Sequence, residues 1–164
     1  METLELVCPA GTPAALRVAV TAGADAVYVG FRDETNARNF PGLNFSPEEL
    51  AEAIDFAHER GVKVYLAVNT YAKAGNNEPW IKAIDNADRL KVDAIILADI
   101  GLLDYAANKY PDLRLHLSVQ ASASNPTSIN FYVREFGVRR VVLPRVLSVS
   151  EIKEINGQID AGSE

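Results

Sequence analysis

The chain has 164 residues, of which 48% are hydrophobic and 23% charged, and its formal net charge is −6. This acidic balance argues against nucleic acid as a partner, because sequence-independent binding needs a basic face to neutralise phosphates. The only cysteine, Cys8, can neither form an internal disulfide nor supply by itself the ligands of a metal centre, so no metal site is expected. Length and composition are those of one soluble domain.

No targeting segment is expected at the N-terminus, since Glu2 and Glu5 lie where a signal peptide carries positive charge. The longest apolar runs, such as residues 94–98, are too short to span a bilayer. We therefore expect a cytoplasmic protein with no membrane span.

The first half of the sequence alternates short apolar runs with helical patterns. Strands are expected at residues 4–8, 26–30 and 62–69. Helices are expected after Thr12 and Ser46, because each is an N-cap residue followed by the proline that commonly begins a helix. A long loop, residues 31–45, follows the second strand, and loops of this length in compact domains are more often functional than idle.

The second half continues the alternation. Strands are expected at 94–98, in the stretch His116–Asn125 with Leu115 before it, and at 140–143, with helices at 79–90, 101–110 and 126–137 and from Ser148. Six successive strand–helix units predict a parallel sheet with right-handed crossovers. A weak internal repeat, and the lack of a Gly-x-Gly-x-x-Gly motif, favour a TIM-type (β/α)-barrel over a doubly wound sheet.

A closed barrel of this type needs eight units, so six units predict an incomplete barrel. We assign residues 1–155 to this partial barrel domain and residues 156–164 to a polar tail. The first and sixth strands would then be unpaired edges, and such edges favour self-association.

The fifth predicted strand departs from the apolar pattern of a buried parallel strand. If it is extended, one face carries Leu115, Leu117, Val119 and Ala121, and the other carries His116, Ser118, Gln120 and Ser122. Buried polar groups cost free energy unless they find partners. The pattern therefore predicts that this strand lines a cavity that holds water or a ligand.

Further polar residues lie near the predicted carboxyl ends of strands, where barrels of this type bind ligands. The substrate-pocket candidates are Asn69, Ser118, Gln120, Ser122, Asn125, Arg145, Tyr65 and Arg38. This set is rich in amides and hydroxyls with a cation at the rim, which suits an oxygenated, carboxylated small molecule.

Several of these residues have simpler interpretations. Ser118 and Gln120 can satisfy one another through buried water, and His116 is most simply a hydrogen-bonded core histidine. Asp99 is better explained as an N-cap than as a catalytic acid. Catalytic residues stay unassigned, because the sequence has no His-Glu-x-x-His, Gly-x-Ser-x-Gly or P-loop motif.

Five motifs together resemble a known family. They are C-P-A-G-T-P-A-A-L from Cys8, G-A-D-A-V-Y-V-G-F from Gly23, T-N-A-R-N-F-P-G-L-N-F from Thr35, H-L-S-V-Q-A-S-A-S-N from His116 and R-V-V-L-P-R-V-L-S from Arg140. In this order they resemble the N-terminal part of the U-thirty-two family of collagenase-like peptidases. The resemblance runs from Leu4 to Lys153 and is strongest to the branch that acts in ubiquinone biosynthesis.

The resemblance implies a (β/α)-barrel and, for that branch, an iron–sulfur protein that acts with a homologous partner. The pair would support oxygen-independent hydroxylation of a small-molecule ring precursor. The family's cysteine signature lies downstream of the matched region, so the ligands of a 4Fe-4S cluster are expected beyond residue 164. This chain alone would then bind no cluster and be inactive.

Two other functions stay open within the family. A collagenase-like peptidase would need a nucleophile–base pair that the sequence does not show. An RNA hydroxylation factor is the other, and the acidic charge balance counts against it.

Overall fold

The structure is a computed structural model and describes residues 4–159. It contains a parallel sheet with strand order β1-β2-β3-β4-β5-β6, in which a helix follows each strand. The strands are β1 (Val7–Pro9), β2 (Ala26–Gly30), β3 (Lys63–Val68), β4 (Ala94–Leu97), β5 (Leu115–Leu117) and β6 (Arg140–Val141). The helices are α1 (Pro13–Thr21), α2 (Pro47–His58), α3 (Glu78–Leu90), α4 (Ile100–Lys109), α5 (Pro126–Phe136) and α6 (Val149–Asn156), and a 3-10 helix, η1, spans Val119–Ala121.

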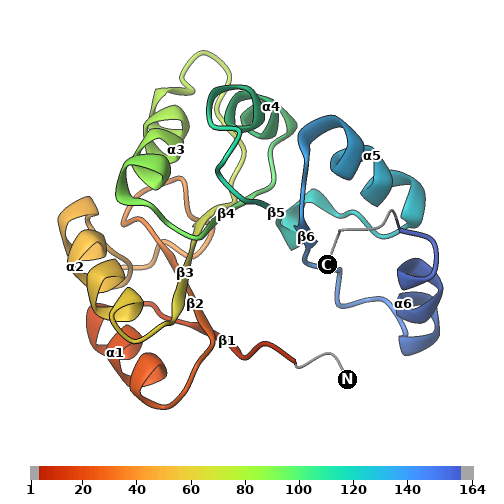
Figure 1. Ribbon diagram of the computed structural model, residues 1–164. Coiled ribbons are helices and arrows are strands. Elements are labelled where there is room, and N and C mark those ends of the chain that lie inside the picture. Colours follow the sequence, from red (N-terminus) through yellow and green to blue (C-terminus); the bar gives the residue numbers. More distant parts are fainter. Residues whose placement is uncertain (1–3, 160–164) are drawn as a thin grey trace.

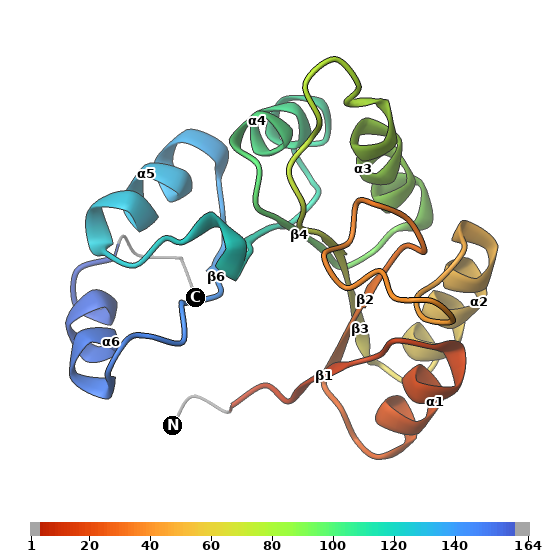
Figure 2. The ribbon, with the colours of Figure 1, turned by 180° about the vertical axis from the view of Figure 1, so that it is seen from behind.

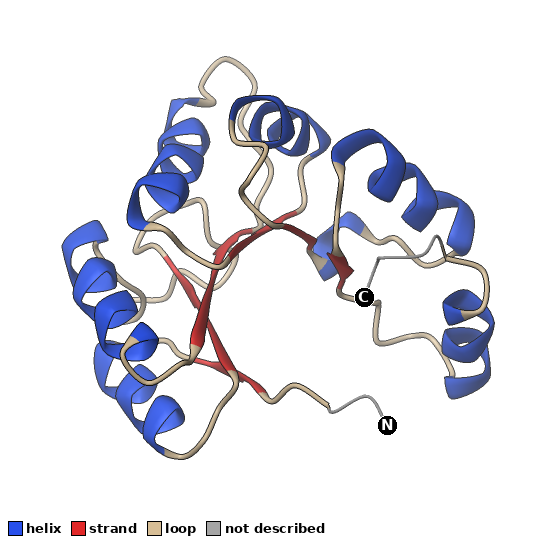
Figure 3. Ribbon diagram, in the orientation of Figure 1, coloured by secondary structure: helices blue, strands red, loops and turns tan. Residues whose placement is uncertain are grey.

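The sheet curls into an arc with all six helices on its convex side (Figure 1). Seen from behind, the same arc stays open between β1 and β6 (Figure 2). Figure 3 shows the strands as an inner layer and the helices as an outer layer. The prediction of an incomplete TIM-type (β/α)-barrel with six units is therefore confirmed.

The main hydrophobic core lies between the sheet and the helices. In β3, Val64, Leu66 and Val68 are fully buried and belong to this core. The intervening residues of the strand face the concave side, where Tyr65 packs in a separate small cluster with Ala26 and Ala94. Alternation along the strands thus places one set of apolar side chains against the helices and a second set on the concave face of the sheet, which we call the inner wall.

Helix starts follow the sequence signals. Thr12 accepts a hydrogen bond from the Ala15 amide at 3.1 Å, and Ser46 and Ser148 each form a capping box with the glutamate three residues later. Asp99 caps α4 by accepting from the backbone N–H groups of Gly101 and Leu102, as the simpler interpretation of that residue predicted. No helix within residues 4–159 is long and apolar enough to cross a membrane.

The predicted extended conformation of the His116–Asn125 stretch is wrong beyond Leu117. The Ser118 Oγ accepts a hydrogen bond from the Gln120 amide at 3.3 Å, and this local bond starts η1 in place of further strand pairing. The turn leaves Ser122 with a φ of 54°. Alternation therefore fails after Ser118, and Gln120 and Ser122 are exposed in and after η1.

Strand ends also differ from the prediction by a few residues. β1 begins at Val7 instead of Leu4, although the Leu6 carbonyl still accepts hydrogen bonds from the Asp25 and Ala26 amides. β6 ends at Val141, short of residue 143. The polar tail predicted from residue 156 begins where α6 ends, and residues 160–164 lie outside the described part of the chain.

Candidate functional site

The inner wall carries charged and aromatic side chains near the amino ends of the strands. Glu5, just before β1, accepts hydrogen bonds from the Tyr65 hydroxyl at 2.9 Å, from Arg140 at 2.5 Å and from Lys63 at 3.2 Å. We call these four residues the Glu5 cluster. Because Arg140 begins β6, the cluster joins the two edges of the sheet across the interior.

The Glu5 cluster fixes the protonation of its members. Partial burial favours the neutral carboxyl of Glu5, but hydrogen bonds from Arg140, Tyr65 and Lys63 favour the charged form more strongly and lower its pKa to about 2. Burial, together with the Glu5 carboxylate, raises the pKa of Tyr65 to about 12. Neither group exchanges a proton near neutral pH, so the cluster is suited to stability and not to acid–base catalysis.

The polar side chains of β5 are also satisfied inside the protein. His116 is buried, its ring lies edge-on to Tyr65 with centroids 4.9 Å apart, and its Nε2 accepts from Arg114 at 3.2 Å. Ser118 is buried as well and caps η1. Within residues 4–159, every buried side-chain nitrogen or oxygen has a hydrogen-bond partner. The polar inner face thus finds partners in the protein itself.

The carboxyl face is built differently, and its largest feature is the loop of residues 31–45. The loop is closed at its base by the paired Phe31 and Phe45. Inside it, the Asn36 Nδ2 donates to the Asn44 Oδ1 at 3.0 Å, and the Asn44 Nδ2 donates to the Arg38 carbonyl at 2.9 Å. The loop is therefore held in one shape by its own asparagines.

This loop rests on the end of β3. The Asn69 Oδ1 accepts from the Ala37 amide at 3.0 Å, and the Thr70 hydroxyl donates to the Glu34 carbonyl at 2.7 Å. The Thr70 oxygen also accepts from the Trp80 indole at 2.8 Å, which ties the loop to α3. Arg38 follows the docked segment directly, and its side chain is exposed.

A second connection on this face joins the loops after β3 and β5. The Tyr71 hydroxyl donates to the Gln120 carbonyl at 2.7 Å, while the Tyr71 side chain stays 54% exposed. Sequence reasoning did not single out Tyr71 or Asn44, because neither lies on a predicted strand. The length of the loop was the signal that pointed to its asparagines, and an aromatic residue two positions after Asn69 was the signal for Tyr71.

The structure brings only some of the predicted pocket residues together. The Asn69 side chain, at the carboxyl end of β3, binds the backbone amide of Ala37, the residue before Arg38. Tyr65 and Ser118 lie on the inner wall, and Tyr65 belongs to the Glu5 cluster at the amino end.

The other candidates lie elsewhere. Gln120 is exposed in η1 and contributes its backbone carbonyl to Tyr71. Asn125 is the N-cap of α5 and accepts from the Ser128 amide at 2.9 Å. Ser122 and Arg145 are exposed in the loops after β5 and β6.

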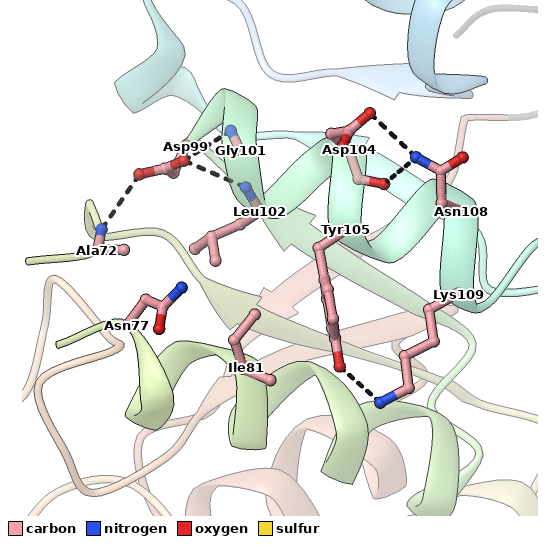
Figure 4. A pocket seen from close by; sticks show the side chains of 10 residues that line it. All are labelled: Ala72, Asn77, Ile81, Asp99, Gly101, Leu102, Asp104, Tyr105, Asn108 and Lys109. Carbon is pink, nitrogen blue, oxygen red and sulfur yellow. Dashed lines mark hydrogen bonds between the residues drawn. The ribbon is translucent and has the colours of Figure 1, made fainter. Parts of the chain in front are cut away.

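Two cavities lie among the helices outside the sheet. One of about 600 Å³ lies between α3 and α4 and is lined by residues that include Asn77, Ile81, Asp99 and Tyr105 (Figure 4). The other, of about 400 Å³, includes Phe31 and Lys82 in its lining. None of the eight predicted pocket residues lines either cavity.

Neither Cys8 nor His58 forms a nucleophile–base pair in the described part of the chain. Cys8 is a partly buried thiol packed against the core. His58 is the last residue of α2, and its Nε2 is 2.8 Å from the Asp93 Oδ2. No group of three or more His, Cys, Asp or Glu residues within 4–159 could hold a metal ion. A 4Fe-4S cluster bound by four thiolates does not fit a chain that contains one cysteine.

The six parallel strands and their outer helices define an open (β/α)-barrel of the TIM type. The chain belongs to peptidase family U32, whose family model matches residues 11–164. Among solved structures, a U32 peptidase superposes with a TM-score of 0.80 at 20% identity, covering 98% of this chain and 67% of that one.

Curated relatives carry several names. The chain is 38% identical to tRNA hydroxylation protein P of Haemophilus influenzae, covering 94% of this chain and 33% of the relative. It is 37% identical to an uncharacterized protease of Methanocaldococcus jannaschii, covering 94% and 37%. It is 34% identical to a collagenase of Porphyromonas gingivalis, covering 94% and 36%. The chain thus spans about a third of the length of these relatives.

Proposed function

We propose that this chain is the N-terminal barrel region of a hydroxylation protein of family U32. The observation that carries this proposal is its similarity to tRNA hydroxylation proteins, at 38% identity over 94% of the chain for the Haemophilus influenzae protein. A relative named 23S rRNA 5-hydroxycytidine C2501 synthase, from Escherichia coli, is 34% identical over 98% of the chain. The first name describes hydroxylation of tRNA and the second the formation of 5-hydroxycytidine in rRNA, so we infer hydroxylation as the reaction class.

For the substrate we propose the ubiquinone ring precursor, in the manner of UbiU. The support is the resemblance of the loop around T-N-A-R-N-F and of R-V-V-L-P-R-V-L-S to UbiU. On this proposal the protein acts with a UbiV-like homologous partner, and cysteines beyond residue 164 hold the 4Fe-4S cluster. This chain would supply the substrate-facing loops and no cluster ligand.

The alternative acceptor is a nucleobase in RNA, as the relatives' names describe. The net charge of −6 counts against it, since binding to RNA requires neutralisation of phosphates. A peptidase is the third candidate, and a collagenase among the relatives favours it. Among the described residues, neither Cys8 nor His58 offers that reaction a nucleophile–base pair.

Deletion of the gene in its host, grown without oxygen, tests the acceptor. Mass spectrometry of quinones and of hydroxylated nucleosides should show loss of ubiquinone with nucleosides unchanged. Loss of hydroxylated nucleosides alone would contradict the ubiquinone proposal and support RNA. If both pools are unchanged, hydroxylation itself is contradicted.

A second test concerns the cluster. The purified chain, reconstituted anaerobically with iron and sulfide, should show no cluster absorption in the visible range, since it has one cysteine. Stoichiometric uptake of a 4Fe-4S cluster would contradict the placement of the ligands beyond residue 164.

We also propose that this chain associates with itself through its open sheet edges. Leu6 beside β1 is 55% exposed and Val142 beside β6 is 42% exposed, and both edges carry unpaired backbone groups. Light scattering should show a dimer or larger species at high concentration. A strictly monomeric chain would contradict the proposal.

A further inference from the structure

The larger of the two cavities, between α3 and α4, has a volume of about 600 Å³. Small-molecule sites in proteins have volumes of about 300–1,000 Å³, so this cavity has the size of a ligand site. We call it the α3–α4 cavity. None of the eight predicted pocket residues lines it, so a ligand bound here would be separate from the substrate of the proposed function.

Hydrogen bonds join the two walls of the α3–α4 cavity at both of its ends. At one end, the Asp99 Oδ2 at the start of α4 accepts from the Ala72 amide at 3.1 Å, as Figure 4 shows. At the other end, the Tyr105 hydroxyl and the Lys109 Nζ of α4 both donate to the Asp85 Oδ1 of α3, at 2.8 and 3.0 Å. The spacing of the two helices is therefore fixed, and the cavity exists before any ligand arrives.

Apolar side chains from both helices form the inner surface of the α3–α4 cavity. Leu102 and Tyr105 lie three residues apart and so share one face of α4, and Ile81 lies opposite them on α3 (Figure 4). Leu102 is buried, whereas Ile81 and Tyr105 are only half-buried. A ligand with an aromatic or hydrocarbon body would remove this remaining apolar surface from water, which favours binding.

The polar groups that line the α3–α4 cavity favour a cation. Asp104 is exposed, and within residues 4–159 its carboxylate forms no ion pair; its Oδ1 accepts only from the Asn108 amide group, at 3.0 Å. Lys109 is already paired with Asp85. The side chain of Asn77 is exposed and makes no capping bond to α3. A cation would thus meet an unpaired carboxylate, whereas an anion would be repelled by it.

We propose that the α3–α4 cavity binds a small organic cation that consists of an ammonium group and an aromatic or hydrocarbon body. The ammonium group would donate to the Asp104 carboxylate, and the body would pack against Ile81 and the ring of Tyr105. This inference goes beyond the proposed hydroxylation. Its test measures binding to the purified chain, so it can fail while the proposed function holds, and the reverse.

The test uses three probes of similar shape that differ in charge: phenylethylamine, phenylethanol and phenylpropionate. Ligand-observed NMR at neutral pH and low salt should show saturable binding of phenylethylamine. Phenylethanol should bind about threefold more weakly, the effect of losing one exposed ion pair, and phenylpropionate more weakly again. Added salt should weaken only the binding of the amine. Equal binding of the amine and the carboxylate, or no saturable binding of the amine, would overturn the proposal.

Substitutions of Asp104 locate the ammonium group. Asp104→Asn should weaken phenylethylamine binding about threefold, and Asp104→Lys should reverse the preference, so that phenylpropionate binds more tightly than phenylethylamine. Both variants change an exposed side chain and should stay folded. Asp55→Asn, at an exposed aspartate of α2, is the matched control and should change nothing. Unchanged amine binding in Asp104→Asn, or equal weakening by Asp55→Asn, would contradict a site at this cavity.

A substitution of Ile81 locates the body of the ligand. Ile81→Ala should weaken phenylethylamine and phenylethanol by the same factor, about threefold, because both place the same ring against this side chain. Circular dichroism checks that the variant is folded. Unchanged binding of both probes in folded Ile81→Ala would contradict the packing of the ring between α3 and α4.

Discussion

Two tyrosines on one strand and its loop show how the two ends of this half-barrel differ. Tyr65 is 3% exposed, and its hydroxyl donates to the Glu5 carboxylate inside the amino end. Tyr71, six positions later, donates to a backbone carbonyl and leaves its ring 54% exposed on the carboxyl face. One ring is enclosed by its partners, and the other is held in place but uncovered.

The two ends of the half-barrel therefore differ in which side chains they leave open to a ligand. At the amino end, Glu5, Tyr65, Lys63 and Arg140 bind one another across the sheet, which stabilises the arc. At the carboxyl end, hydrogen bonds of asparagines and backbone fix the loops, and the side chains of Arg38 and Tyr71 stay available. This division matches the general pattern of (β/α)-barrels, in which the carboxyl face carries function and the amino face stability.

The largest expected effect of a substitution is at Gly30, where the long loop begins. A Cβ there would lie 1.9 Å from the buried Nδ2 of Asn36, so the loop must shift and lose its hydrogen bond to Asn44. Gly30→Ala should cost about 3 kcal/mol of unfolding free energy. Chemical denaturation measures it. Gly11→Ala, whose Cβ would make only ordinary contact with Leu43 at 3.7 Å, is the control and should cost less than about 0.5 kcal/mol.

Arg140→Ala tests how much the Glu5 cluster stabilises the amino end. It removes the contact between β6 and Glu5, and the carboxylate keeps only Tyr65 and Lys63. Because the two side chains remain 23% and 20% exposed, the loss should be about 1–2 kcal/mol and not the larger value of a fully buried pair. A variant as stable as the wild type would show that the Glu5 cluster does not join the edges.

Acid should weaken the same cluster. The pKa of Glu5 is lowered from 4.5 to about 2, so its stabilising contribution is fully present above pH 4.5 and is lost as pH falls toward 2. Glu5→Gln should therefore reduce the pH dependence of the unfolding free energy in this window. Glu52→Gln, at an exposed glutamate of α2, controls for the loss of one carboxylate. Equal slopes for Glu5→Gln and the wild type would contradict the assignment.

Substitutions of Asn125 test whether this predicted pocket residue acts only as the N-cap of α5. Its side chain accepts from the Ser128 amide at 2.9 Å, so Asn125→Ala should cost about 1 kcal/mol and Asn125→Ser should restore most of it. Hydroxylation by the Ser variant of the longer protein should be unchanged. A loss of product with Asn125→Ser would return this residue to the pocket.

Sequence patterns predicted the fold better than the site. Regular alternation of strands and caps such as Thr12, Ser46 and Asp99 follows from local chemistry, which the sequence shows directly. The prediction of an extended strand failed after Leu117, where the Ser118 Oγ accepts a hydrogen bond from the Gln120 amide and η1 begins. The alternation of side chains does not reveal that a local hydrogen bond competes with strand pairing there. Contacts between distant segments, such as Glu5 with Arg140 or Ala37 with Asn69, depend on the folded geometry and have no sequence signature.

The most direct test compares the two tyrosines in the longer protein, expressed in the deletion strain. Tyr65→Phe should lower the unfolding free energy by about 1 kcal/mol and leave the hydroxylated product unchanged. Tyr71→Ala should change stability by less than about 1 kcal/mol and abolish most of the product. Full product from a folded Tyr71→Ala protein, together with loss of product in Tyr65→Phe, would contradict the placement of function on the carboxyl face.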